Sequence, residues 1–296
     1  MNEMSSAADL VRYLAAKAWG VWSAPASVAR FSAFAGALIL WLMWKRAVQK
    51  RWPLLVSRNA ATDAIYTAFY LGGIYSFFFA APLFAVSERT IIRFAPYLRL
   101  HLLDGAPAIV QILVVSFTID FAGYWAHRLG HESSFFWRFH RIHHSQTELT
   151  PLTGYRFHVV EALYRGLAPM IPGIMLGSTT ASFTIAIFID TVLNAAAHSG
   201  GSWTFGALGY AFVSPQYHRV HHALDPELHH GNYGLTYSIW DRMFGTAVDA
   251  RKTPEAYGIS ETVPESFFAQ LVDPFLINGQ RGAGAGPADG VVSVSQ

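Results

Sequence analysis

The side chains best suited to chemistry in this chain are its histidines, which gather in one part of the sequence. All of them except His101 lie between His127 and His230. The chain has no cysteine, so thiolate metal sites and cysteine nucleophiles are excluded. A metal ion bound here would therefore be held by histidine, carboxylate or amide side chains.

Eight of these histidines form three short motifs. The first is an H-x-x-x-H pair, whose spacing of four places both imidazoles on one face of a helix. Two H-x-x-H-H motifs follow, and their histidines also share a helical face. Neutral imidazoles on one face favour metal binding, whereas protonated ones would repel. Because one ion takes only about four to six ligands, the motifs predict two ions. Their histidines are His127 and His131, then His140, His143 and His144, then His218, His221 and His222.

The composition indicates a chain that lies in lipid. Charged residues make up 14% of the sequence and the mean hydropathy is +0.28, whereas a soluble domain carries about 25% charge. A net charge of +2 and the absence of a basic run among aromatic residues argue against a nucleic-acid partner.

Four apolar stretches predict membrane-spanning helices, because each approaches or exceeds the roughly 20 residues that a span requires. The fourth is too long for one span. Its proline and glycine residues predict a hairpin that turns near Gly177. The stretches cover residues 28–44, 65–86, 106–125 and 163–197.

The charges between the first two stretches predict an orientation. Lys45, Arg46, Lys50, Arg51 and Arg58 lie there without an acidic residue among them, and the positive-inside rule places such a loop in the cytoplasm. The histidine motifs then emerge on the same side. We therefore expect an all-α, multi-pass integral membrane bundle of about four transmembrane helices, with a cytoplasmic helical cap that carries a histidine-ligated dinuclear metal site.

The sequence also predicts three regions. Residues 1–27 mix apolar and basic residues and are expected to form an interfacial segment. Residues 28–270 are expected to form the membrane domain. Residues 278–296 are rich in glycine, alanine, serine and proline, so we expect a disordered tail.

The motifs and their order resemble the fatty acid hydroxylase and sterol desaturase superfamily, whose members are membrane-bound, histidine-rich di-iron oxygenases. Residues 155–161 resemble the family's R-F-H-P-x-E segment, with Val159 in place of the proline. Residues 232–234 and 238–246 resemble its N-Y-G and S-x-W-D-x-x-F-G-T segments. The resemblance covers about residues 105–250.

This resemblance implies an O2-dependent hydroxylase that inserts oxygen into a C–H bond of a lipid, fatty acyl or sterol-like substrate. It implies two iron ions as cofactors and an external electron donor of the ferredoxin or cytochrome b5 type. A desaturase with the same ligands is the alternative. A zinc-dependent membrane hydrolase, with Glu132 as its base, and a membrane metal transporter remain as further alternatives.

The resemblance further implies that His198 is a ninth ligand. Asn194, four residues earlier, is either a tenth ligand or a partner of a helix carbonyl. Asp120 and Asp190 lie in apolar stretches and could each accept the free ring N–H of a ligand histidine, or pair with a basic residue of another helix.

Three further polar residues complete the expected surroundings of the ions. His158 and Glu161 are three positions apart, so they could meet beside the ligands or form an interfacial ion pair. Glu132 follows His131 directly. We expect His229 and His230 to be solvated, and His101 to lie on the opposite side of the membrane. Asp241 is expected to hold the cap together.

Overall fold

The computed structural model describes residues 23–49, 58–75, 97 and 100–276, and every structural statement below concerns these residues. They are helical and contain no named β-strand; two isolated bridges pair Phe212 with Tyr237 and Ala223 with Tyr257. The all-α class is confirmed. The α-helices are α2 (Pro25–Gln49), α3 (Arg58–Leu71), α5 (Ala108–Glu132), α6 (Ser134–His144), α7 (Val159–Leu176), α8 (Thr180–Ala197), α9 (Pro215–His221), α10 (Pro226–His229), α11 (Ile239–Met243) and α12 (Phe267–Leu276), with 3-10 turns η2 (Thr153–Tyr155) and η3 (Gly206–Tyr210).

Three helices are long and apolar enough to cross a membrane: Pro25–Val48, Ala108–Glu132 and Thr180–Ala197. Their outer faces expose large apolar side chains such as Leu40 and Leu113, which suits contact with lipid rather than water. The protein is therefore a membrane protein. The second predicted span, 65–86, lies partly outside the described residues, and its residues 65–71 belong to α3.

The predicted hairpin within 163–197 is confirmed. Helix α7 ends at Gly177, whose φ of 73° is a left-handed conformation that glycine adopts without strain. The Thr179 side chain then caps α8 by accepting a hydrogen bond from the Ser182 amide. Gln111 of α5 fixes this turn, because its Oε1 accepts from the Thr179 amide at 2.9 Å. Helix α7 begins at Val159, earlier than the apolar pattern indicated.

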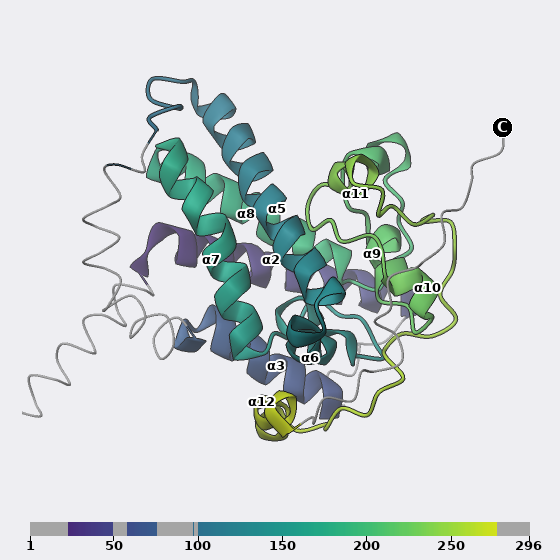
Figure 1. Ribbon diagram of the computed structural model, residues 1–296. Helices are drawn as coiled ribbons and strands as arrows, with labels where there is room; N and C mark the ends of the chain where they lie inside the picture. Colours follow the sequence, from purple (N-terminus) through teal and green to yellow (C-terminus); the bar gives the residue numbers. More distant parts are fainter. Residues whose placement is uncertain (1–22, 50–57, 76–96, 98–99, 277–296) are drawn as a thin grey trace, which may run out of the picture.

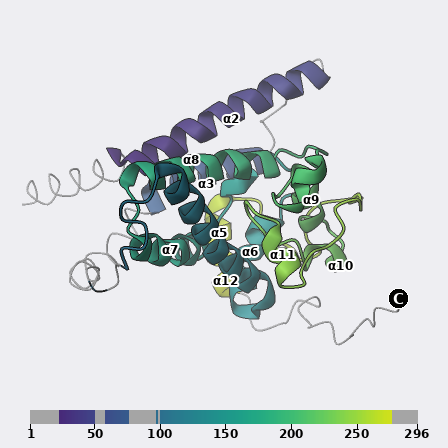
Figure 2. The ribbon, with the colours of Figure 1, turned by 90° about the horizontal axis from the view of Figure 1, so that it is seen from above.

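Helices α5, α7 and α8 pack together, and α2 lies along the outer side of α8 (Figures 1 and 2). Val115 and Ile119 of α5 pack with Ala186 and Ile187 of α8. The Trp41 indole of α2 donates to the carbonyl of Ser199, just past the end of α8, at 2.8 Å. These contacts fix the ends of α5 and α8, where the histidines lie.

The short helices α9, α10 and α11 and the loops between them form a second region beside this bundle (Figure 1). Ser214 caps α9 and Pro215 is its first residue. Helix α9 ends at His221, and Pro226 opens α10. Asp241 holds this region together, since its carboxylate accepts from the amides of Tyr233 and Gly234.

Candidate metal centre

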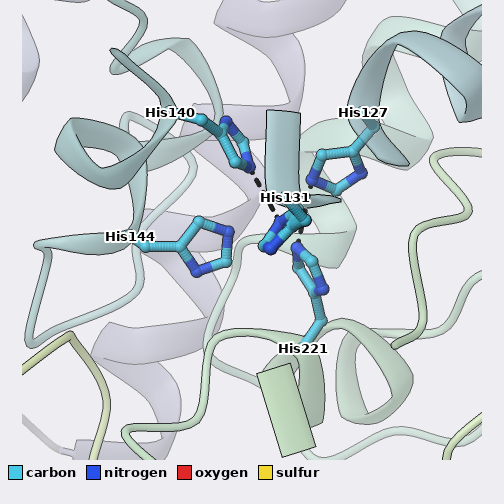
Figure 3. A group of neighbouring side chains, drawn as sticks. All are labelled: His127, His131, His140, His144 and His221. Atoms are coloured by element: carbon cyan, nitrogen blue, oxygen red, sulfur yellow. Dashed lines mark hydrogen bonds between the residues drawn. The ribbon is translucent and has the colours of Figure 1, made fainter. Parts of the chain in front are cut away.

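Nine histidines gather in two buried groups at the end of the bundle. Within each group the candidate ligand atoms all lie within 4.8 Å of one another. The side chains of the first group point toward a common centre from α5, α6 and α9 (Figure 3). The five-histidine group consists of His127, His131, His140, His144 and His221, and the four-histidine group consists of His143, His198, His218 and His222.

The two H-x-x-H-H motifs each contribute to both groups. The pair spaced by four stays together, so His140 and His144 enter the five-histidine group while His218 and His222 enter the four-histidine group. The middle histidine of each motif crosses to the other group: His143 joins the four and His221 joins the five. The motifs are therefore not two separate rows, as a shared helical face alone suggested.

The distances between ring nitrogens match those expected around an ion. In the five-histidine group, Nε2 of His131 lies 2.9 Å from Nε2 of His140. In the four-histidine group, Nε2 of His218 lies 2.9 Å from that of His198 and 3.1 Å from that of His222. Ligand nitrogens about 2.1 Å from a metal in tetrahedral or octahedral geometry stand roughly 3.0–3.4 Å apart.

Metal ligation requires neutral imidazoles, and lowered pKa values of histidines in both groups favour that form. Burial, reinforced by neighbouring imidazoles, holds the pKa of His143, His144 and His222 well below the usual histidine value. Burial lowers the pKa of His198 to about 4. Neither ring nitrogen of His144 has a hydrogen-bond partner among the described residues. Because an unpaired buried polar atom is costly, these rings fit two metal ions.

Three ligand candidates are oriented by backbone carbonyls that accept from their outer ring nitrogens. Nδ1 of His127 donates to the carbonyl of Tyr233 at 2.7 Å, and Nδ1 of His221 donates to that of Gly231 at 2.8 Å. Because a carbonyl only accepts, the proton must sit on Nδ1, which leaves the Nε2 lone pair for a metal. His198 is held in the same way by the Asn194 carbonyl at 2.9 Å.

Glu161 fulfils the role expected of a carboxylate beside the ligands. Its Oε1 accepts from Nδ1 of His140 at 2.7 Å, and both side chains are fully buried. The same oxygen accepts from the Arg165 guanidinium at 3.2 Å. The second expected partner, His158, does not pair with Glu161; its Nδ1 caps α7 by accepting from the Val160 amide.

The expectation that Asp120 accepts from a ligand imidazole is wrong. Its carboxylate accepts from the amides of Thr236 and Tyr237 and from the indole of Trp240, at 2.8, 3.1 and 2.8 Å. The loop that carries these donors also carries Tyr233, so the influence of Asp120 on His127 is indirect. A spacing of two turns on one helix could not reveal that a loop more than 100 residues later takes the carboxylate.

Two other carboxylates also lie away from the histidines. Asp190 accepts from the Thr236 hydroxyl at 2.7 Å and faces a cavity. Glu132 forms an exposed salt bridge with Arg128. Neither contacts a ligand imidazole, so both expectations are corrected.

His229 is the residue that the sequence placed incorrectly in solvent. It is buried, its ring stacks on Trp137 with centroids 5.9 Å apart, and it lies 6.2 Å from the ring of His144. Its position after Pro226 gave no periodic signal, since it is brought here by the short helix α10. His230 is half-buried, and His101 is exposed and bonded to Asp104.

A cavity of about 500 Å³ lies between α2, α5, α7 and α8, and two of its lining residues separate it from the four-histidine group. Phe157, which lines it, packs against the ring of His143 at 5.4 Å. Gly154 lines it too, and a side chain there would come within 3.0 Å of His198. Its size suits a small molecule or part of a lipid. Asn194 also lines this cavity, so its amide is placed beside the four-histidine group.

Comparison with known proteins identifies the class to which this fold and these histidines belong. Residues 112–246, slightly less than half of the chain, match the fatty acid hydroxylase family. The resemblance inferred from the motifs is thereby confirmed.

The similar proteins act on lipids, by their names. An ornithine lipid hydroxylase from Rhizobium tropici is 31% identical over 179 residues, which are 60% of this chain and 54% of that protein. An alkylglycerol monooxygenase from Caenorhabditis elegans is 31% identical over 153 residues, covering 51% of this chain and 30% of that protein. A very-long-chain aldehyde decarbonylase from Oryza sativa subsp. indica is 26% identical over 174 residues, covering 58% and 65%. The chain thus spans about half or less of the length of the first two relatives. No solved structure matches it.

Proposed function

We propose that this protein is an O2-dependent lipid hydroxylase in which the nine histidines hold two iron ions. The observation that carries the proposal is a cavity between the apolar helices whose lining residues Phe157 and Gly154 lie against His143 and His198 of the buried four-histidine group. A lipid in that cavity would lie beside the four-histidine group without leaving the bundle. The names of the ornithine lipid hydroxylase and alkylglycerol monooxygenase relatives support the same reaction class.

The two rival functions fit the geometry less well. A zinc hydrolase needs a carboxylate base beside an open metal position, but Glu132 forms an exposed pair with Arg128. A metal transporter needs ligands distributed along a path across the membrane. Here His127 and His131 lie in the last turns of α5 and His198 directly follows α8, so the ligands gather at one end of the helices.

The bound irons would supply the activation of O2 with two electrons from an external donor of the ferredoxin or cytochrome b5 type. The residues of the chain would orient the ligands and hold the substrate. Nδ1 contacts such as that of His140 with Glu161 fix the direction of the ligand lone pairs. The apolar walls of the cavity, including Ile119, Phe183 and Ile187, exclude water and hold the substrate against the centre. A desaturase would use the same parts, and it remains the alternative.

Metal analysis combined with product analysis tests this function. Protein purified from iron-replete cells should contain close to two iron ions per chain, and it should consume O2 when a lipid extract and a reductant are supplied. A lipid that gains one oxygen atom indicates hydroxylation, whereas loss of two hydrogen atoms indicates desaturation. Zinc in active protein, or turnover without O2, would contradict the proposal.

The membrane arrangement is part of the same proposal. We propose four spans, a cytoplasmic helical cap and a cytoplasmic metal centre within a domain of residues 28–270. The basic residues Lys45 and Arg46 at the end of α2 support this orientation. Reporter fusions after Gln146 test it, since a signal only from the far side would reverse the topology. The interfacial segment 1–27, apart from residues 23–27, and the tail 278–296 lie outside the described residues.

A further inference from the structure

The cavity beside the four-histidine group carries ionisable side chains within a bundle of apolar helices. Arg30 of α2, Arg165 of α7, and Asp120 and Asp190 of α5 and α8 all line it. Charged groups at this depth are costly and are normally paired or functional. Any of these four side chains that has no charged partner within the protein therefore indicates the charge that a ligand would carry.

Two of the four charges are satisfied. The Arg165 guanidinium donates to Glu161 at 3.2 Å and lies 4.6 Å from the centre of the Phe157 ring. Asp120 accepts three hydrogen bonds from the loop at 236–240. Neither side chain needs a partner from the cavity.

The other two charges lack an ionic partner. Among the described residues, Arg30 forms no salt bridge, and its recorded contact is with the ring of Tyr70 at 5.8 Å. Asp190 forms none either, and accepts one hydrogen bond from the Thr236 hydroxyl. Both side chains are half-buried and line the same cavity, yet they do not pair with each other. A positive and a negative group thus line one cavity without a direct ion pair between them.

We propose that this cavity binds a lipid through a zwitterionic head group, with its anionic part at Arg30 and its cationic part at Asp190. Such a head group would neutralise both side chains without leaving a net charge inside the bundle. Phe157 lines the same cavity on the side of the metal centre, where it packs against the ring of His143, and would contact the attached chain. The proposal rests on the proposed function in taking the cavity as the place where the substrate lies.

The distance along α8 between Asp190 and the metal centre is consistent with a head group bound at Asp190. Asp190 precedes His198 by eight residues on α8 and its continuation, which is about 12 Å along a helix axis. A head group bound at Asp190 therefore leaves room for several carbon atoms between the charged groups and the four-histidine group.

Binding measurements on the full-length, metal-loaded protein in detergent test the proposal without turnover. Native mass spectrometry would rank five single-chain amphiphiles that share one acyl or alkyl chain length. They are a monoacylglycerol (neutral), a fatty acid (anionic), an alkylamine (cationic), Nε-acyl-lysine (ammonium and carboxylate) and lysophosphatidylcholine (quaternary ammonium and phosphate). We expect a zwitterion to bind at least about tenfold more tightly than the monoacylglycerol, which corresponds to about 1.4 kcal/mol.

Two variants assign the charges. Arg30→Gln should weaken binding of the fatty acid and the zwitterions by about tenfold and leave the alkylamine and monoacylglycerol unchanged. Asp190→Asn should weaken binding of the alkylamine and both zwitterions instead, and leave the fatty acid unchanged. Arg46→Gln is the matched control, because Arg46 is exposed near the end of the same helix and does not line the cavity. Metal content and the unfolding midpoint of each variant check that it folds.

The outcomes are distinct. If the monoacylglycerol binds as tightly as both zwitterions, or if Arg30→Gln weakens all five probes alike, the proposal is wrong. The ranking on the unmutated protein decides this even if a variant does not fold. A stronger preference for Nε-acyl-lysine identifies an amino-acid head group, and one for lysophosphatidylcholine a phosphate head group; either supports the charge pairing. Absence of iron would overturn the oxygenase proposal but not the head-group proposal. Lipid binding that does not depend on head-group charge, together with intact O2-dependent turnover, would overturn the head-group proposal but not the oxygenase proposal.

Discussion

The five-histidine group and the four-histidine group differ in how their outer ring nitrogens are held. In the first, His127, His140 and His221 each donate from Nδ1 to an oxygen, and for His140 that oxygen belongs to the Glu161 carboxylate. In the second, His198 alone has such a partner among the described residues, a backbone carbonyl. The first group therefore has more ligands, which are also oriented more firmly.

The cavity lies beside the four-histidine group, whose outer ring nitrogens have fewer partners. It is lined by Phe157, which packs against His143, and by Gly154 and Asn194 beside His198. A catalytic metal keeps a coordination position open, whereas a structural one is closed by protein ligands. We infer that the four-histidine group faces the substrate and that the five-histidine group anchors the second ion. The predictions below test this division.

The largest effect is expected from removal of a ligand of the smaller group. His143→Ala leaves three imidazoles there and should reduce metal content to about one ion per chain while abolishing turnover. His131→Ala is the matched variant, because it leaves four imidazoles in the larger group and should retain more metal. Metal content and product formation are measured on both. If His143→Ala kept both ions and full activity, its assignment as a ligand would be wrong.

A smaller effect is expected from the carboxylate that orients His140. Glu161→Gln retains an oxygen that can accept from Nδ1 but loses the charge that raises the basicity of the ligand. Such changes typically cost about 10–100-fold in metal affinity or activity. Competition with a chelator measures the affinity, and the loss should affect the more tightly held ion. Equal weakening of both ions would remove the distinction between the groups.

Asp120→Asn should lower the stability of the fold more than it lowers catalytic activity. The carboxylate of Asp120 accepts from three donors, but an asparagine side chain would turn an NH2 group toward at least one of them. At least one charge-assisted hydrogen bond is therefore lost, at a cost of about 1.5–3 kcal/mol in the free energy of unfolding. The unfolding midpoint should fall, and metal should be lost partly, through the loop that holds His127. Activity per bound metal should stay near that of the unmutated protein. A fall in activity at full metal content and stability would indicate a direct contact with the centre.

The smallest effect is expected at Glu132. Its exposed pair with Arg128 should contribute at most about 0.5 kcal/mol, so Glu132→Gln should leave metal content, stability and turnover nearly unchanged. The test uses the same three measurements. Abolished turnover would instead make Glu132 a catalytic base and would favour the hydrolase alternative.

Local spacing predicted the parts of the site that lie within one helix. The histidines four apart are adjacent in both groups, and the proline and glycine residues correctly indicated the α7–α8 hairpin. Glu161 was found because its position in a motif placed it near the ligands. These features depend on helical geometry, which sequence separation determines.

Contacts between distant segments could not be predicted in the same way. The loop at 233–241 donates hydrogen bonds to Asp120, and its Tyr233 carbonyl accepts one from His127, but neither contact has a periodic signal. The burial of His229 likewise depends on Trp137, which comes from another helix. The crossing of His143 and His221 is set by the relative rotation of α6 and α9, which no single motif specifies.

The exchange of middle histidines between the two motifs affects how the protein acquires its metals. An ion bound by His140 and His144 fixes the last turn of α6, and this same turn carries His143 for the other group. Helix α9 provides the reciprocal connection through His218, His221 and His222. If two ions bind as proposed, the first would bear most of the entropic cost of ordering both helices, and the second would bind to an arrangement already formed. Loading would then be positively cooperative, and at substoichiometric iron the chains would divide mainly into empty and doubly loaded populations.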